Sequence, residues 1–297
     1  MLAPAAHPVF ADLCELGLSG PDSLRPYYPK VRDRDDISVL RCERSGVLLL
    51  SSCDQIDTSY YQNQQDLNYW GTVDPSAAVL EGTEDLDRRS RDLRYLVPNK
   101  RWLDVGTGVG GILERIGPLA AEVAGVEPQA SVHAWLQTLG YQIYSDLVSA
   151  PERHFDVVTL FHVFEHVREP LAFLKEVRAR MAPGGIVVIE VPHAKDFLLS
   201  FLNLDAFKQS TFWSEHLLLH TRLTLEAFLR AAGFQQISTR GCQRYPVANH
   251  LMWLAKGLPA GQNIWQELRT PQLDHAYEEM LAGLDMTDTL VATARVV

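Results

Sequence analysis

The feature that most constrains the fold is the segment 101–111, which reads RWLDVGTGVGG. A short apolar run ends in glycines at positions 106, 108, 110 and 111, and Ile112, Leu113 and Ile116 then recur at helical spacing. This pattern predicts a strand, a tight turn and a helix. Glycine adopts backbone angles that side chains disfavour and lets a ligand approach the main chain closely. The first turn of the helix adds free N–H groups. We therefore expect a cofactor at this turn.

The identity of that cofactor is not decided by the glycines alone. Gly106, Gly108 and Gly111 satisfy GxGxxG, and Glu127 follows about 20 residues later, where dinucleotide enzymes place an acid for the ribose hydroxyls. A nicotinamide enzyme and a nucleoside-binding methyltransferase both fit this spacing. Asp104 favours the methyltransferase, because its carboxylate would repel a pyrophosphate but tolerate a cationic amino-acid group.

From Lys100 to about Arg244 the pattern alternates between strands and helices, which predicts parallel strands joined by crossovers. Asp288 opens the alternating segment DTLVATARVV, which we interpret as the seventh strand, preceded by a helical insertion at about 246–286. A competing interpretation makes residues 250–256 the seventh strand. The other expected strands follow the motif at 121–127, 141–144, 155–161, 186–191 and 235–242.

The region from about 100 to 240 resembles the class I S-adenosylmethionine (SAM) methyltransferases. The resemblance is carried by LDVGTGVG, by Glu127 and by the order FDVV…EHV…P…L…PGG…VP, and it is the main reason to prefer a methyltransferase over a dehydrogenase. It implies SAM as the cofactor. It also implies an α/β fold with a doubly wound, Rossmann-like sheet of seven mostly parallel strands and an antiparallel last strand.

The same resemblance assigns cofactor-binding roles to individual residues. Gly106, Gly108 and Gly110 would hold the methionine end, Glu127 the ribose and Asp146 the adenine, although Asp146 fits a helix cap equally well. The implied cofactor-binding set is completed by Asp104, Thr107, Pro128, Phe161 and His162.

Residues 1–95 are expected to form an N-terminal extension or lid before a methyltransferase domain at 96–297. Residues 37–50 predict a hairpin that is similar to the zinc knuckle preceding some sugar methyltransferases. Ser45 stands where the second thiolate after Cys42 would be, so we expect no metal there. Tyr60 and Tyr61 belong either to a packed surface segment or to a lid over the cofactor or acceptor.

The acceptor site is expected at the carboxyl ends of the strands and in the loop FWSEHLLLHT. A hydroxyl acceptor must lose a proton, a task that suits histidine. We therefore predict His162, His193 and His216 as candidate bases, with Glu215 and His220 on the acceptor side. His166 competes for the same role, but Glu165 and His166 belong to the family motif and are expected to hold the strand-to-helix turn beside the cofactor. His216 and His220 have metal-binding spacing if helical, but a third ligand is not evident, so no metal is expected. The helix that follows is predicted to begin at an N-cap Thr224.

The predicted function is SAM-dependent methyl transfer to a small polar acceptor, with a sugar or natural-product hydroxyl favoured. The alternatives are an NAD(P)-dependent oxidoreductase and a SAM-binding subunit without catalysis. A net charge of −10 argues against a nucleic-acid partner. Four irregularly spaced cysteines, no signal-like start and no run of membrane-spanning length predict a cytoplasmic protein without a membrane partner. A homodimer is left open.

Overall fold

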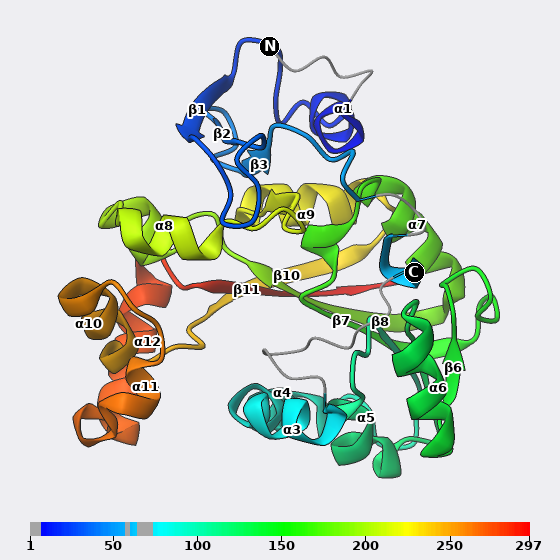
Figure 1. Cartoon of the computed structure of the whole chain (residues 1–297). Coiled ribbons are helices and arrows are strands. Elements are labelled where there is room, and N and C mark those ends of the chain that lie inside the picture. Colours follow the sequence, from blue (N-terminus) through cyan, green and yellow to red (C-terminus); the bar gives the residue numbers. More distant parts are fainter. Residues whose placement is uncertain (1–6, 57–59, 64–73) are drawn as a thin grey trace.

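The computed structural model describes residues 7–56, 60–63 and 74–297. Its centre is a seven-stranded sheet in the order β10-β11-β8-β7-β4-β5-β6 (Figure 1). β11 runs antiparallel to both of its neighbours, whereas the pairs from β8 to β6 are parallel. This is the doubly wound sheet that the sequence predicted. Its strands are β4 (Arg101–Val105), β5 (Glu122–Val126), β6 (Gln142–Tyr144), β7 (Phe155–Phe161), β8 (Met181–Pro192), β10 (Gln235–Cys242) and β11 (Thr289–Arg295).

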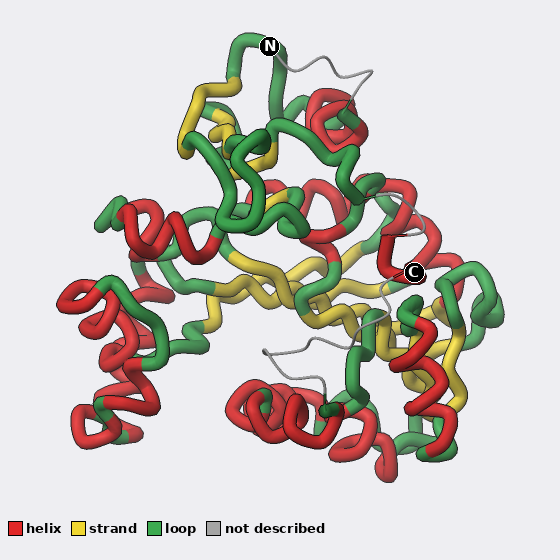
Figure 2. Tube along the Cα trace, in the orientation of Figure 1, coloured by secondary structure: helices red, strands yellow, loops and turns green. Residues whose placement is uncertain are grey.

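Helices cover both faces of this sheet (Figures 1 and 2). α7 and α9 lie on one face, and α3, α4, α5 and α6 lie on the other. β7 is accordingly buried on both faces, which explains why it reads as a continuous apolar run. The bounds of the covering helices are α3 (Pro75–Glu81), α4 (Thr83–Leu93), α5 (Gly111–Ile116), α6 (Ala130–Thr138), α7 (Pro170–Arg180) and α9 (Arg222–Ala231).

The C-terminal segment supplies β11, as the preferred interpretation predicted. The competing interpretation is wrong, because residues 250–256 lie in a helix, α10 (Val247–Lys256). Met252 and Trp253 of this helix are buried while Leu251 and Leu254 are exposed, a pattern that helical rather than strand periodicity produces. Between α10 and β11 the chain forms α11 (Gly261–Ile264) and α12 (Pro271–Gly283).

Two predicted element boundaries are wrong by a few residues. The strand expected at 186–191 begins earlier, because Met181 already pairs with Phe155 in β8. The N-cap of α9 is Thr221 rather than Thr224. Thr221 accepts a hydrogen bond from the backbone of Thr224, whose side chain accepts one from the backbone of Thr221 in return. Both threonines are good caps, so residue type alone did not separate them.

The N-terminal part contributes a second, antiparallel sheet. The predicted hairpin is present as β2 (Val39–Cys42) and β3 (Leu48–Leu50), flanked by β1 (Leu24–Tyr28). The fourth strand, β9 (Leu218–Leu219), comes from the loop after β8 and pairs with β3. Helix α1 (Pro8–Glu15), which the sequence did not reveal, packs on α7. There Asp12 Oδ2 accepts a hydrogen bond from the backbone N of Leu171 at 2.9 Å.

The apolar residues of this second sheet and the α7/α9 side of the large sheet form one continuous core. Cys42 is buried within it, with the hydroxyl oxygens of Ser19 and Ser23 at 3.3 and 3.4 Å from its sulfur. The hydroxyls of Ser19 and Ser23 are themselves 3.0 Å apart. Hydroxyl groups thus surround the single thiol of the knuckle-like hairpin.

Candidate active site

The turn after β4 requires glycine at several positions. Gly106, Gly108 and Gly110 have φ values of +69°, +51° and +78°, a region that other residues rarely adopt. A Cβ atom on Gly106 would lie 2.4 Å from Val163 Cγ2, and one on Gly110 would lie 2.5 Å from Leu136 Cδ2. The glycines therefore bring their main chain directly against Val163 and Leu136, and α5 begins directly after the turn.

Glu127, which follows β5, is bonded to this turn. Its carboxylate accepts hydrogen bonds from the backbone N of Gly108 at 3.0 Å and of Gln129 at 2.9 Å. The side chain is buried, and burial raises its pKa to about 7 despite these two bonds. The acid predicted for the ribose and the glycine turn thus belong to one site.

Asp104 lies within the sheet, just before the turn. It accepts a hydrogen bond from Thr159 Oγ1 at 2.5 Å, and Trp102 Nε1 donates to the same hydroxyl at 2.9 Å. Burial raises the pKa of Asp104 to about 6. Thr107, in the turn itself, is also buried, and its backbone N donates to Val126 O.

The residues at this edge fit a SAM molecule. The glycine turn leads directly into the first backbone N–H groups of α5, and two buried carboxylates can accept hydrogen bonds from hydroxyl and ammonium groups. Asp146 is exposed and accepts bonds from Ser149 N at 2.8 Å and Ser149 Oγ at 2.7 Å, as a turn cap does. Its contact with adenine stays a prediction, as does the role of Pro128.

A second polar group lies after β7, at the same edge of the sheet. His162 has φ +56°, and its Nδ1 and Nε2 lie 3.1 Å from Glu165 Oε1 and 3.2 Å from Glu190 Oε1. Burial acts to lower the pKa of His162, but the two carboxylates outweigh it and raise the pKa. Glu190 of β8 is in turn paired with Arg88 at 2.8 Å and Arg89 at 2.6 Å, both from α4.

Phe161, the last residue of β7, carries the guanidinium of Arg89 over its ring at 4.5 Å. Phe161 contacts α4 through Arg89, and His162 is linked to α4 through Glu190. Their predicted contact with the cofactor stays a prediction.

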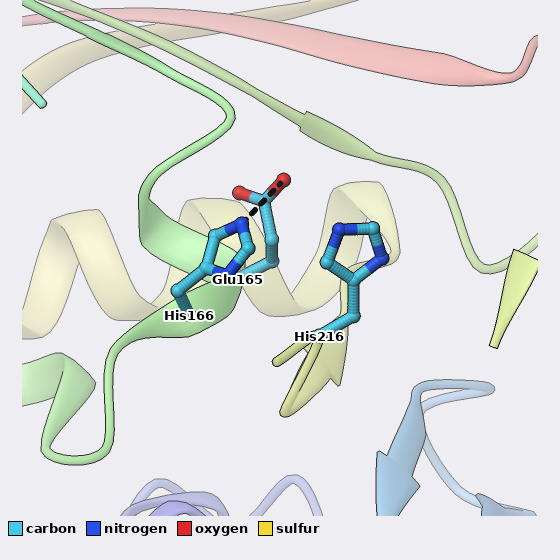
Figure 3. Close-up of side chains that lie close together, drawn as sticks. All are labelled: Glu165, His166 and His216. Carbon is cyan, nitrogen blue, oxygen red and sulfur yellow. Dashed lines mark ion pairs between the residues drawn. The ribbon is translucent and has the colours of Figure 1, made fainter. Parts of the chain in front are cut away.

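His166, which follows Glu165, lies beside His216 of the loop FWSEHLLLHT. Ring centroids of His166 and His216 are 5.0 Å apart, and His166 Nε2 lies 3.9 Å from Glu165 Oε1 (Figure 3). Ligand-type atoms of these three residues all lie within 4.8 Å of one another. We call Glu165, His166 and His216 the carboxylate–imidazole cluster.

The predicted lid tyrosines contact this cluster. Tyr60 OH donates to Glu215 Oε1 at 2.8 Å, and Tyr61 OH donates to Glu215 Oε2 at 3.4 Å. Tyr61 OH also lies 3.1 Å from His166 Nδ1. Residues from α2 (Tyr60–Asn63) and from the loop before β9 thus meet beside the end of β7. The remaining residues of the SYYQNQQDLNYWG stretch, apart from those of α2, lie outside the described residues.

His193 and His220 do not join the cluster. They form a strand-like main-chain bridge, and their side chains are buried. His193 Nδ1 lies 3.0 Å from Thr287 O, and the His220 ring stacks on Phe164 at 4.9 Å. Burial lowers the pKa of His193 to about 4 and that of His220 to about 3. His193 as a base and His220 as an acceptor residue stay predictions, with no opening to solvent at either.

The hypothesis of a helical His216–His220 pair is wrong, because this segment is a loop followed by the short strand β9. The neighbours of His216 are Glu165 and His166, which come from the turn after β7. Sequence spacing gave no sign of this, since about fifty residues separate the two segments.

Comparison with known proteins identifies the class. The family model for the methyltransferase domain matches residues 62–239, more than half of the chain. The chain belongs to this methyltransferase family, and it is a SAM-dependent enzyme. This finding supports neither the oxidoreductase alternative nor any nicotinamide cofactor.

Two curated relatives are enzymes of one name from different bacteria. The ubiquinone biosynthesis O-methyltransferase of Cereibacter sphaeroides is 32% identical over 177 residues, which cover 53% of this chain and 70% of the relative. The protein of that name from Rhodopseudomonas palustris is 35% identical over 129 residues, covering 40% and 51%.

Among solved structures, a SAM-dependent methyltransferase from Thermotoga maritima aligns with a TM-score of 0.52 at 14% identity, covering 75% of this chain and 94% of that one. This likeness shows the fold alone. Within the described ranges, none of the helices has the length and apolar character needed to cross a bilayer.

Proposed function

We propose that this enzyme transfers the methyl group of SAM to a hydroxyl oxygen of a small polar molecule. The observation that carries the proposal is the carboxylate–imidazole cluster beyond β7. β7 is paired with β4, which leads into the glycine turn, so the cluster and the cofactor turn follow neighbouring strands. An acceptor hydroxyl lying at the cluster would be within the same crevice as the cofactor.

The chain's contribution is positioning and proton removal. SAM, when bound, supplies an activated methyl group on its sulfonium. Gly106–Gly110 and Glu127 would hold it, and Tyr60 and Tyr61 would close the acceptor side against water. The negative charge and lone pairs of Glu165, Glu215 and the two imidazoles would draw the proton from the hydroxyl, a requirement that a sulfonium methyl donor leaves to the protein.

The acceptor class we favour is a phenolic hydroxyl. The curated relatives support this choice, because they are named as O-methyltransferases of ubiquinone biosynthesis. A sugar or other natural-product hydroxyl, the acceptor expected from the sequence, is the second class to examine. We further propose residues 1–95 as a lid-bearing extension of the catalytic domain, because Tyr60 and Tyr61 lie against the cluster.

The test is a product screen by mass spectrometry. Catechols, other phenols, sugars and primary amines are incubated with the enzyme and SAM, and we expect methylated phenols. Glu127→Ala should lose SAM affinity, whereas Glu215→Gln should keep it and lose turnover. Glu43→Gln, whose side chain is 57% exposed in an ion pair with Arg25, is the control and should change neither. Methylation of amines alone would contradict the proposal, and so would full turnover by Glu215→Gln.

A further inference from the structure

We propose that Glu165, His166 and His216 form a binding site for a divalent transition-metal ion of the zinc class. Two imidazoles and one carboxylate are a common donor set for catalytic Zn²⁺, which leaves a coordination position open to a substrate oxygen. The existence of the site rests on the geometry of these residues. Its role in catalysis rests on the proposed function, because the open position would take the acceptor hydroxyl.

The first observation is the convergence of the three side chains. Figure 3 shows His166 on one side and His216 on the other side of the Glu165 carboxylate, with ring nitrogens turned toward it. Their ligand atoms lie within 4.8 Å of one another. Zinc–ligand bonds of about 2.0–2.2 Å bring tetrahedral ligands to roughly 3.4 Å from one another. Small side-chain rotations would close the remaining distance.

The second observation is an unsatisfied oxygen on the carboxylate of Glu165. The side chain of Glu165 is 0% exposed. One oxygen, Oε1, is held by His162 Nδ1 at 3.1 Å. The other, Oε2, is buried without a hydrogen-bond partner among the residues that the structure describes. A buried carboxylate oxygen in this state is costly unless a cation or a donor reaches it.

The third observation concerns the orientation of His166. In the proposed site Tyr61 OH donates to Glu215 Oε2 at 3.4 Å and accepts from His166 Nδ1–H at 3.1 Å. This arrangement leaves the lone pair of His166 on Nε2, which faces Glu165 Oε1 at 3.9 Å. The separation is too long for a hydrogen bond. It exceeds the roughly 3.4 Å between tetrahedral zinc ligands by about 0.5 Å, which a small rotation of either side chain would close.

Tyr61 and His162 are then the outer partners that orient the ligands. Tyr61 fixes the tautomer of His166, and His162 holds one oxygen of Glu165. A coordinated hydroxyl loses its proton more readily than a free one. We assign Glu215, whose carboxylate is hydrogen-bonded to Tyr60 and Tyr61 beside the cluster, as the group that would receive this proton.

The test uses Co²⁺ as a spectroscopic probe of the whole, tag-free chain. We expect one equivalent of Co²⁺ to bind with visible d–d bands typical of a low-coordinate nitrogen and oxygen site, and one equivalent of Zn²⁺ to displace it. His216→Asn and His166→Asn should each abolish the bands. His275→Ala removes a histidine that is 70% exposed on α12, and it should leave the spectrum unchanged.

A fourth variant is needed because His166→Asn and His216→Asn could lose the bands through misfolding. Tyr61→Phe keeps every ligand but frees the tautomer of His166, and it should weaken Co²⁺ binding by about tenfold or more. Binding below one equivalent by the wild type would overturn the proposal. Wild-type affinity in Tyr61→Phe together with unchanged bands in His216→Asn would also overturn it.

The chemical role is separated from the binding site by a chelation experiment. Full phenol methylation after complete removal of metal would refute the role of the ion while leaving the proposed function intact. Stoichiometric Co²⁺ binding without methylation of any hydroxyl acceptor would refute the proposed function and leave the metal site standing.

Discussion

Replacement of Gly106 by alanine tests whether glycine is needed there for its left-handed backbone angle and for its close contact with Val163. Gly106 has φ +69°, and a Cβ atom there would lie 2.4 Å from Val163 Cγ2. The left-handed conformation costs a non-glycine residue about 1–2 kcal/mol. Relief of the contact with Val163 adds about 1–3 kcal/mol. We therefore expect Gly106→Ala to lower the free energy of unfolding by roughly 2–5 kcal/mol.

Gly17 provides a matched control, because its φ is also +69° but a Cβ atom would meet nothing within 4 Å. Gly17→Ala should therefore cost only the backbone share, about 1–2 kcal/mol. Urea unfolding followed by circular dichroism gives both values by linear extrapolation. Calorimetric titration should show weaker SAM binding by Gly106→Ala and unchanged binding by Gly17→Ala. Equal destabilisation by the two substitutions would refute the reasoning from the Val163 contact.

Three further outcomes are expected. SAM affinity should fall as pH drops through about 7, where the buried carboxyl of Glu127 takes up a proton, and Glu127→Gln should flatten this dependence in titrations at pH 6, 7 and 8. The folded-state pKa of Glu127 is raised from its unfolded value of 4.5 to about 7. Its contribution to the stability of the ligand-free protein is therefore lost as the pH rises from 4.5 to about 7. Glu190→Gln should cost about 3–5 kcal/mol in urea unfolding, because it leaves two partly buried arginines without their carboxylate, while the exposed Glu43→Gln should cost under about 0.5 kcal/mol. Thr221→Ala removes the cap of α9 and should cost about 1 kcal/mol, and a thermal melt unchanged from the wild type would contradict the capping assignment.

The elements that the sequence predicted well are determined by residues that are close to one another in the sequence. The strand at 155–161 is apolar because both of its faces are covered, and the glycines at 106–110 are imposed by local backbone angles and close contacts. The last strand was predictable from the alternation of its residues. Each of these properties can be read from neighbouring residues.

The properties that escaped prediction depend on contacts between distant segments. His166 and His216 are about fifty residues apart, and their approach is decided by the course of two loops. His220 was predicted on the acceptor side because it belongs to the loop FWSEHLLLHT. In the structure its ring is buried and stacks on Phe164. Thr221 and Thr224 are equivalent as residue types, and only the observed hydrogen bonds identify the cap.

The pairing of β3 with β9 has a consequence for biosynthesis. Leu48, Leu49 and Leu50 of β3 are all buried in the finished protein, but their strand partner, Leu218 and Leu219, emerges from the ribosome about 170 residues later. Until then the nascent N-terminal sheet presents an open apolar edge, a feature that promotes association between chains. The yield of folded protein should therefore depend on the synthesis rate and on the supply of chaperones.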